Sequence, residues 1–307
     1  MIKIGRKQKL ADISIIIVTY NHEHEITRCL TTLRSAITSF QTEIFIIDNH
    51  SIDQTVFIAK KLLSNLENKH CWSIICNEVN KGFTRAVNQG LAQSRGEYVL
   101  ILNPDTELPV NVFRPLIEEF HNNNEVGIVS PQFSNHDGTI QPSCRRFPRH
   151  RDVIYNAIGF NLLFSQSNEF NYWKMDDFDH QTQKEVEQPQ GAFLLVRREA
   201  IGQVGLLDEQ FPMFFSDVDW CRRFIQKGWK ILFVPGVQII HHKGTSIYKN
   251  RLKMIWSSHR SFYHYFKKYY RGVGWQILNL TTGEILIGVA ILRSTFYLLT
   301  SKNMKDY

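Results

Sequence analysis

Polar side chains follow three apolar runs of this sequence, at the point where each run ends. The run over residues 98–102 stops at Asn103-Pro104-Asp105, where the proline ends sheet pairing and a carboxylate stands at the strand's exit. Thr19-Tyr20-Asn21 and Asp48-Asn49 follow two other runs in the same way. Open α/β sheets bind their ligands at the C-terminal ends of their strands. The repetition therefore predicts a polar ligand site at one sheet edge, although each group alone is also an ordinary turn or cap.

Two further carboxylates, Asp217 and Asp219, stand in the first turn of a predicted helix. Ser216 is a suitable N-cap and Gly228 a suitable stop, so we expect a helix over residues 217–227. The helix dipole stabilises carboxylates at this end, and that effect alone accounts for both residues. Asp219 is also spaced to pair with an arginine at position 222 or 223. A structural role therefore suffices for Asp219.

The elements that must position these residues alternate between strand and helix. The alternation is typical of a parallel sheet with right-handed crossovers. No Gly-x-Gly-x-x-Gly follows the first strand, which excludes the usual dinucleotide-binding turn. The predicted strands cover residues 13–18, 44–47, 74–76, 98–102, 127–130 and 193–196, with two more around Pro235-Gly236. The predicted helices cover residues 25–37, 53–66, 83–93, 110–122 and 197–201.

Composition favours a cytoplasmic protein with one large domain. The chain has 307 residues and 43% hydrophobic content, enough for one big domain or a domain with an appendage. Its five cysteines show neither metal-type pairs nor disulfide-like spacing, which indicates reduced thiols. The basic N-terminus runs into a strand without a signal-type apolar segment, so we expect no export.

The net charge of +7 is concentrated in the tail. Residues 251–307 carry nine Lys/Arg and two Asp/Glu, whereas residues 1–250 carry 27 of each. The main body therefore lacks a nucleic-acid-binding footprint. In the tail, aromatic and apolar residues at helical spacing over residues 252–270 lie among basic residues. A second apolar segment over residues 285–300 is interrupted by Arg293, and its uninterrupted part is too short for a membrane span. We expect this tail to lie on a membrane surface, or else to pack as a helical hairpin against the main domain or a dimer partner.

The ordered motifs resemble those of family 2 inverting glycosyltransferases of the GT-A fold, in particular the bacterial rhamnosyltransferase-like branch that builds cell-surface polysaccharides. The motifs are residues 15–21, residues 47–53, Asn80-Lys-Gly-Phe83 with Asn88-Gln-Gly90, and residues 102–105. Each is weak alone, but the ordered set, over roughly residues 12–247, is specific. The resemblance implies a Rossmann-like, mostly parallel sheet flanked by helices, with a catalytic domain over residues 1–250 and a helical, membrane-associating appendage over 251–307.

The resemblance also implies a nucleotide-sugar site at the strand ends. Tyr20 would lie against the pyrimidine ring, although packing is the ordinary role of a tyrosine after a buried strand. Asp48 would accept a hydrogen bond from the base. The other residues that the resemblance assigns to nucleotide-sugar binding are Thr19, Asn21, Asn80, Gly82, Asn103, Gly191 and Ala192.

A metal site and a general base complete the resemblance. Asp105 and His241 would hold a divalent ion, Mg2+ or Mn2+, against the diphosphate of the donor. The family's Asp-x-Asp is here Asn103-Pro104-Asp105, so one carboxylate is replaced by an amide. Asp217 aligns with the family's catalytic base, in a segment where Ser216 replaces the usual Glu. A single base acting on the acceptor hydroxyl implies inversion at the anomeric carbon.

The resemblance makes dTDP-rhamnose the expected donor and a saccharide or polyprenyl-linked saccharide the expected acceptor. We expect the protein to act at the inner face of the plasma membrane and to have no nucleic-acid partner. A homodimer is an open alternative for the tail. The insert over residues 135–188 is poorly patterned, as in a lid or acceptor-binding segment, and its Arg145 and Arg146 would either meet an anionic acceptor diphosphate or be solvated. Two rival functions remain: transfer of another sugar from a UDP donor, and an inactive nucleotide-sugar-binding subunit, which Asn103 and Ser216 would favour.

Overall fold

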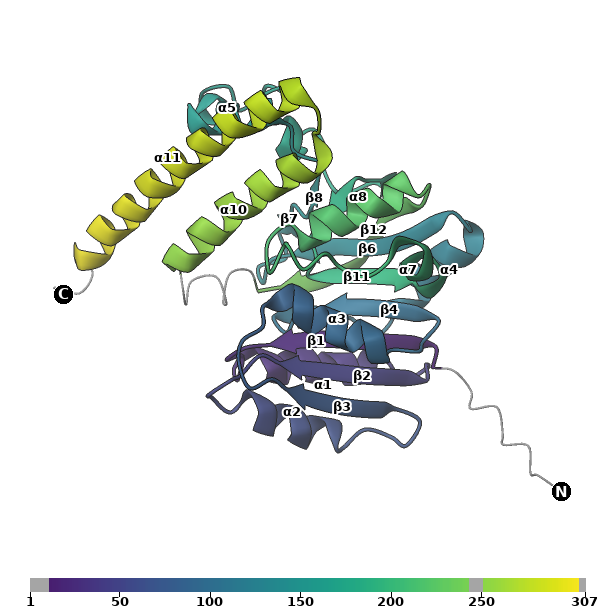
Figure 1. Cartoon of the computed structure of the whole chain (residues 1–307). Helices are drawn as coiled ribbons and strands as arrows, with labels where there is room; N and C mark the ends of the chain where they lie inside the picture. The colour runs from purple at the N-terminus through teal and green to yellow at the C-terminus, as the bar shows by residue number, and fades with distance from the viewer. Residues whose placement is uncertain (1–10, 243–250, 304–307) are drawn as a thin grey trace.

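The structure, a computed structural model, describes residues 11–242 and 251–303. A mixed sheet of ten strands forms its centre, in the order β3-β2-β1-β4-β11-β6-β12-β5, with β7 beside β6 and β9 beside β12 (Figure 1). The strands are β1 (Ile13–Thr19), β2 (Thr42–Asp48), β3 (Cys71–Cys76), β4 (Tyr98–Leu102), β5 (Thr106–Glu107), β6 (Val126–Ser134), β7 (Ile140–Gln141), β9 (Lys184–Glu185), β11 (Phe193–Arg197) and β12 (Lys230–His241).

Helices cover both faces of this sheet. One hydrophobic core contains residues from α1, α2 and α4, and a second contains residues from α3, α7 and α8. The helices are α1 (Glu25–Ala36), α2 (Thr55–Leu63), α3 (Phe83–Gln93), α4 (Phe113–Asn122), α7 (Arg198–Val204) and α8 (Ser216–Gln226). The expected strand and helix alternation is confirmed, with boundaries that move by a few residues.

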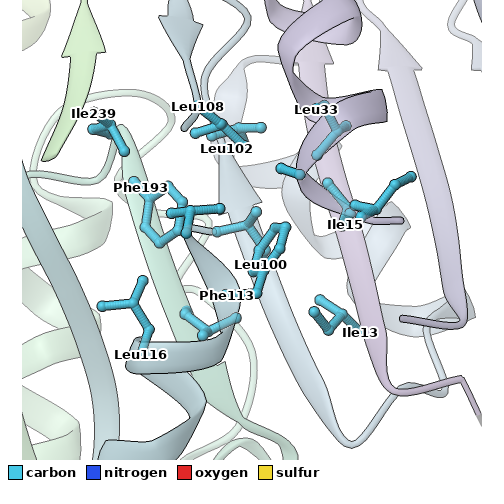
Figure 2. Packing of buried hydrophobic residues seen from close by; sticks show 14 of the residues in the cluster. Ile13, Ile15, Leu33, Leu100, Leu102, Leu108, Phe113, Leu116, Phe193 and Ile239 are labelled. Atoms are coloured by element: carbon cyan, nitrogen blue, oxygen red, sulfur yellow. The ribbon is translucent and has the colours of Figure 1, made fainter. Parts of the chain in front are cut away.

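The β1 strand shows why the predicted apolar runs are strands. All seven of its residues are buried, and their side chains alternate between the two cores. Ile13 and Ile15 pack on one face with Leu33 of α1 and Phe113 of α4 (Figure 2), whereas Ile16 packs on the other face. A parallel strand buried on both faces needs a continuous apolar sequence, which is the pattern that this segment has.

Two strands differ from the sequence-based expectation. β11 runs antiparallel to both of its neighbours, β4 and β6, so the sheet is mixed although mostly parallel. The prediction of two strands around Pro235-Gly236 is wrong, because β12 continues as one strand and its register against β6 shifts between Val234 and Gln238. Proline has no N–H and glycine no side chain to pack, so the pair interrupts the hydrogen-bond ladder without ending the strand.

The insert between β6 and β11 is built from short elements. They are β8 (Cys144–Arg145), α5 (His150–Ala157), α6 (Phe160–Leu163), a 3-10 turn (Tyr172–Lys174) and β10 (Gln188–Pro189), besides β7 and β9. β8 and β10 pair with each other in a separate two-stranded antiparallel sheet. Elements of two to eight residues leave little periodicity, which explains why the sequence of this region predicts no structure.

The tail forms a hairpin of two helices, α10 (Arg251–Tyr269) and α11 (Val273–Asn303), which extends beyond the sheet (Figure 1). α10 is anchored to the body, because Tyr265 and Phe266 share a core with Phe211 and Phe215. The expectation of a short second segment is wrong: α11 begins at Val273. Its 28-residue stretch Val273–Thr300 is long and apolar enough to cross a membrane by length and composition, and 28% of its most apolar window is buried.

Candidate active site

The ends of β1 and β2 bring Thr19 and Asp48 side by side. Thr19 and Asp48 are paired in the parallel register, and the Thr19 hydroxyl donates to Asp48 Oδ1 at 2.7 Å. The backbone N–H of Ser51 donates to Asp48 Oδ2 at 2.8 Å. The Asp48 carboxylate is 2% exposed, so these donors fix its orientation at the sheet edge.

The two residues after β1 present different features. Tyr20 is 41% exposed, so its ring is available to a ligand. The alternative role of this residue, packing in the core, does not agree with this exposure. Asn21 adopts the left-handed region, with φ of 56°, and its Oδ1 accepts from the backbone N–H of Ile52 at 2.9 Å. Asn21 therefore ties the loop after β1 to the loop after β2, and it contributes backbone geometry to the edge.

The loop after β3 places Asn80 and Gly82 near the same edge. Asn80 Oδ1 accepts from the backbone N–H of Gly82 at 2.9 Å, and Asn49, directly after β2, donates through Nδ2 to the carbonyl of Gly82 at 3.1 Å. Gly82 has a φ of 85°, and a Cβ there would lie 2.9 Å from the carbonyl oxygen of Pro212. A side chain at position 82 would therefore be strained and would push away the segment that precedes α8.

Asp105 and His241 face one another across the end of the sheet. Oδ1 of Asp105 lies 3.5 Å from Nε2 of His241, and both side chains are buried. On the other side of the ring, Nδ1 of His241 lies 2.7 Å from Oε1 of Gln141. Since an amide oxygen only accepts, Nδ1 carries a proton, and in the neutral ring Nε2 then presents its lone pair toward Asp105. The backbone N–H of His242 also donates to the Asp105 carbonyl at 2.8 Å, which fixes the two strand ends together.

Asp105 and His241 suit a divalent ion whose coordination shell is completed by a bound ligand. Within residues 11–242 and 251–303, no group of three or more His, Cys, Asp or Glu side chains could hold a metal. Mg2+ commonly takes one or two protein carboxylates and completes its shell with phosphate oxygens and water. A histidine whose second nitrogen donates to an amide oxygen is oriented as metal-ligating histidines usually are. Asp105 and His241 can therefore contribute two ligands beside a diphosphate.

The helix α8 carries Asp217, and it begins one residue earlier than expected. Phe215 is at the N-cap position with a φ of 70°, and Ser216 is the first helical residue. The prediction of Ser216 as N-cap is wrong, because its hydroxyl donates backward to the carbonyl of Met213 at 3.3 Å. The expected stop at Gly228 agrees with its left-handed φ of 86°.

The carboxylate of Asp217 is held from three sides. Its Oδ2 accepts from the backbone N–H of Gly191 at 3.1 Å and from Nε2 of Gln188 at 3.3 Å, and its Oδ1 accepts from the backbone N–H of Val218 at 2.9 Å. Burial raises the pKa of this carboxyl, while these backbone donors and the charge of Arg145 oppose the rise. A half-buried carboxylate with a raised pKa in a fixed orientation has the properties of a general base.

Residues 191 and 192 connect the base to the strand that leads to Asp105. The carbonyl of Ala192 accepts from the backbone N–H of Asn103 at 2.9 Å, next to the Gly191 N–H that holds Asp217. A Cβ on Gly191 would lie 3.1 Å from both Cβ and Oδ2 of Asp217, so only glycine fits without a shift. The structure thus brings Asn103, Gly191, Ala192 and Asp217 together.

Asp219 has the structural role expected, with more partners than its helix supplies. It is fully buried and pairs with Arg223 one turn later, with Nε at 2.9 Å from Oδ2. Its Oδ1 also accepts from Lys268 Nζ and from the Tyr269 hydroxyl, both on α10. Asp219 therefore fastens the first turn of α8 to the tail, which the sequence alone did not indicate.

Sequence reasoning missed Gln141 and Gln188. Gln141 orients His241 from β7, and Gln188 holds Asp217 from β10. Both lie in the insert, in two-residue strands without periodicity. A glutamine in such a context carries no signal that a single sequence reveals.

Residues 14–205 match the family described as Glycosyl transferase family 2. The chain belongs to this family. Among curated relatives, it is 27% identical to the N-acetylglucosaminyl-diphospho-decaprenol L-rhamnosyltransferase of Mycobacterium tuberculosis (strain CDC 1551 / Oshkosh), over 81% of this chain and 82% of the relative. It is 22% identical to the dTDP-rhamnosyl transferase RfbF of Shigella flexneri, over 97% of this chain and 92% of that one.

The fold agrees with that of solved glycosyltransferases of the GT-A type. The mannosyltransferase PcManGT from Pyrobaculum calidifontis, in complex with GDP-Man and Mn2+, superposes with a TM-score of 0.58 and 16% identity. The match covers 98% of this chain and 82% of PcManGT. The family membership and the GT-A fold implied by the sequence motifs are confirmed, and the protein is a glycosyltransferase.

Proposed function

We propose that this glycosyltransferase is inverting and metal-dependent, and that it uses a nucleoside-diphosphate sugar. The observation that carries the proposal is the position of Asp217. It is a half-buried carboxylate that Gly191 holds, directly beside the Ala192–Asn103 hydrogen bond that leads to Asp105. A base on the acceptor side and a cation-binding pair on the donor side are what single-displacement transfer requires.

On the acceptor side, Asp217 takes the proton from the acceptor hydroxyl as that oxygen attacks the anomeric carbon from the face opposite the leaving group. The raised pKa makes the carboxylate a stronger base than an exposed aspartate, closer to the working pH. The N–H groups of Gly191 and Val218 keep its oxygens in place during the attack. A second carboxylate acting as nucleophile is not needed, so the configuration is inverted.

On the donor side, the exposed ring of Tyr20 lies under the pyrimidine base, and Asp48, oriented by Thr19, accepts a hydrogen bond from it. Asp105 and His241 would hold a divalent ion, Mg2+ or Mn2+, beside the diphosphate. When bound, that ion neutralises charge on the departing nucleoside diphosphate. The polar loops with Asn21, Asn80 and Gly82 shape the edge that the nucleotide-sugar occupies.

We infer that the donor is dTDP-rhamnose and the acceptor a polyprenyl-linked saccharide. Two relatives that align over most of this chain are named as rhamnosyltransferases, and one name specifies dTDP-rhamnosyl transfer. The name of the M. tuberculosis relative specifies a decaprenol-diphosphate-linked N-acetylglucosamine. A lipid-linked acceptor places the enzyme at a membrane, and we propose the cytoplasmic face of the plasma membrane.

The tail supports the membrane proposal. Its long helix α11 exposes apolar side chains along its length, and the tail holds the chain's excess of basic residues. Apolar side chains beside basic ones bind anionic bilayers by burial and by charge. Residues 251–307 would act as the membrane-associating appendage of a catalytic domain over residues 1–250.

The test is turnover by the purified full-length chain. Release of nucleoside diphosphate is measured with Mn2+, farnesyl-diphosphate-linked N-acetylglucosamine, and either dTDP-rhamnose or a panel of UDP-sugars. We expect the highest kcat/KM with dTDP-rhamnose and loss of turnover in EDTA. Turnover with a UDP-sugar alone would replace the proposed donor. Calorimetric binding of a nucleotide-sugar without transfer or hydrolysis would make the chain a binding subunit instead.

A further inference from the structure

The insert carries four arginines within seven residues, and one of them differs from the rest. Arg146 forms a bidentate ion pair with Asp177. Arg149 pairs with Asp152 and Glu169, and Arg151 pairs with Glu169. Arg145 has no carboxylate within 4.0 Å and no side-chain hydrogen bond in the described part of the chain. Its guanidinium instead lies over the ring of Trp173, 4.9 Å from the ring centre.

Arg145 stands beside the base. In the β8–β10 pair it is directly opposite Gln188, the residue whose amide donates to Oδ2 of Asp217. Opposite residues of an antiparallel pair project from the same face, so Arg145 and Gln188 face the same side. The charges of Asp176 and Asp217 act on the guanidinium, while burial lowers its pKa below the usual value.

A half-buried arginine without an acidic partner is costly unless a ligand supplies one. Desolvating a charge opposes folding, and proteins normally offset that cost with a partner and hydrogen bonds. The planar guanidinium suits phosphate oxygens, because it donates two parallel hydrogen bonds. The contact with Trp173 positions the guanidinium and uses none of its hydrogen-bond donors.

The location separates this arginine from the donor diphosphate. Gln141 on β7 orients His241, whereas Arg145, four residues later on β8, lies beside Asp217. The two short strands thus contact different groups of the site: Gln141 of β7 orients the cation-binding pair, whereas Arg145 of β8 lies opposite the glutamine that holds the base. An acceptor hydroxyl must reach the base, so the group that carries that hydroxyl passes near Arg145.

We propose that Arg145 binds the diphosphate of a lipid-linked acceptor and positions its sugar hydroxyl at Asp217. This inference rests on the proposed function and deepens it, because it selects a diphosphate-linked acceptor over a neutral saccharide. It also separates the two arginines of the insert: Arg146 is held by Asp177 and shapes the segment, while Arg145 meets the ligand. The donor diphosphate has the same chemistry, so the experiment must distinguish the two sources.

The experiment compares Arg145→Met, Arg145→Lys and the matched control Arg146→Met in the full-length chain. Calorimetry with Mn2+ and saturating dTDP measures the affinity for farnesyl-diphosphate-linked N-acetylglucosamine and for the neutral octyl glycoside of the same sugar. A separate titration measures dTDP affinity. Because binding is measured with the nucleotide site filled, a wrong donor sugar would not affect the result.

We expect Arg145→Met to weaken binding of the diphosphate-linked probe by about 10- to 100-fold, as for loss of hydrogen bonds to a charged group. Binding of the octyl glycoside and of dTDP should be unchanged, and Arg145→Lys should restore part of the loss. Arg146→Met should leave the affinity for the diphosphate probe within about threefold of wild type, with a lower melting temperature.

Three results would overturn the proposal. A loss of dTDP affinity in Arg145→Met would assign the arginine to the donor. Equal losses with the two acceptor probes, together with a shifted pH profile of transfer, would limit its role to the charge of Asp217. Unchanged affinity for every probe would make it a packing residue on Trp173.

Discussion

Replacing Asp217 with Asn separates a chemical role for this residue from a structural one. The amide keeps the size of the carboxylate, but it cannot accept from Gly191 and Val218 at once, since one of its two ends is a donor. The loss of one such hydrogen bond costs about 1 kcal/mol of stability. Removal of a charge that burial disfavours offsets this cost, so we expect the free energy of unfolding at neutral pH to change by no more than about 1 kcal/mol.

The effect on catalysis should be far larger. Loss of a general base slows transfer by about 100-fold to 10,000-fold. Donor affinity should stay the same, because a base acts mainly in the transition state. The assay measures kcat, the Kd of the nucleoside diphosphate by calorimetry, and the melting temperature of each variant.

The pH dependence gives a second, independent readout. Burial raises the pKa of Asp217, so the acid limb of kcat/KM should lie above the ordinary carboxyl value of about 4 and should disappear in Asp217→Asn. The folded state holds this proton more tightly than the unfolded state does. Wild type should therefore lose stability relative to Asp217→Asn as pH rises through the window from about 4 to the raised pKa.

Asp219→Asn is the control, because it lies on the same helix turn and bears the same charge. It should lower stability by about 2–3 kcal/mol, less than for a fully buried pair, since Arg223 and Lys268 are partly exposed. Its residual kcat should follow the folded fraction. Near-normal transfer by Asp217→Asn, or a loss that follows unfolding in the same way, would refute the assignment of the base.

Four further outcomes are expected. Asp105→Asn should weaken nucleoside-diphosphate binding with Mn2+ and have little effect in EDTA, as measured by calorimetry. Gln141→Leu should lower Mn2+ affinity by about 10- to 100-fold in a metal titration, because His241 loses the partner that orients its ring. Gly191→Ala should reduce kcat by about 10- to 100-fold at unchanged nucleotide Kd, since the added Cβ displaces the base. Replacing three exposed apolar residues of α11, Leu292, Phe296 and Leu299, with glutamate should abolish co-sedimentation with anionic liposomes at an unchanged melting temperature. Sedimentation equal to that of wild type would show that this helix face does not bind the bilayer.

The parts of the fold that the sequence predicts well are those that one local pattern determines. The strand over residues 98–102 and the helix over 83–93 agree with the structure to the residue, since a continuous apolar run and a helical period each have few alternatives. The sequence places the start of α8 one residue late, because the N-cap is Phe215, which has no capping side chain and takes the left-handed conformation. The sequence places the start of the second tail segment too late, because the polar run Thr281-Thr282-Gly283-Glu284 separates the apolar beginning of α11 from residues 285–300.

The site divides in the same way. Asp48 and Asp105 follow strands, so their position at one edge could be predicted from the alternation of elements. The contacts that orient the chemistry are long-range: Gln141 and His241 are 100 residues apart, and Gln188 and Asp217 are 29 apart. No local pattern encodes such pairs, and their partners in the insert lie on strands of two residues. Tertiary structure was needed to find them.

The stereochemistry of transfer tests the central claim most directly. The anomeric configuration of the new glycosidic bond is determined by NMR spectroscopy on the product of the full-length chain with dTDP-rhamnose, Mn2+ and farnesyl-diphosphate-linked N-acetylglucosamine. One base, Asp217, opposite the departing diphosphate predicts a configuration inverted relative to the donor, formed at a rate that Asp217→Asn greatly reduces. A product that retains the configuration of the donor would contradict the single-displacement mechanism and the role of Asp217 in it.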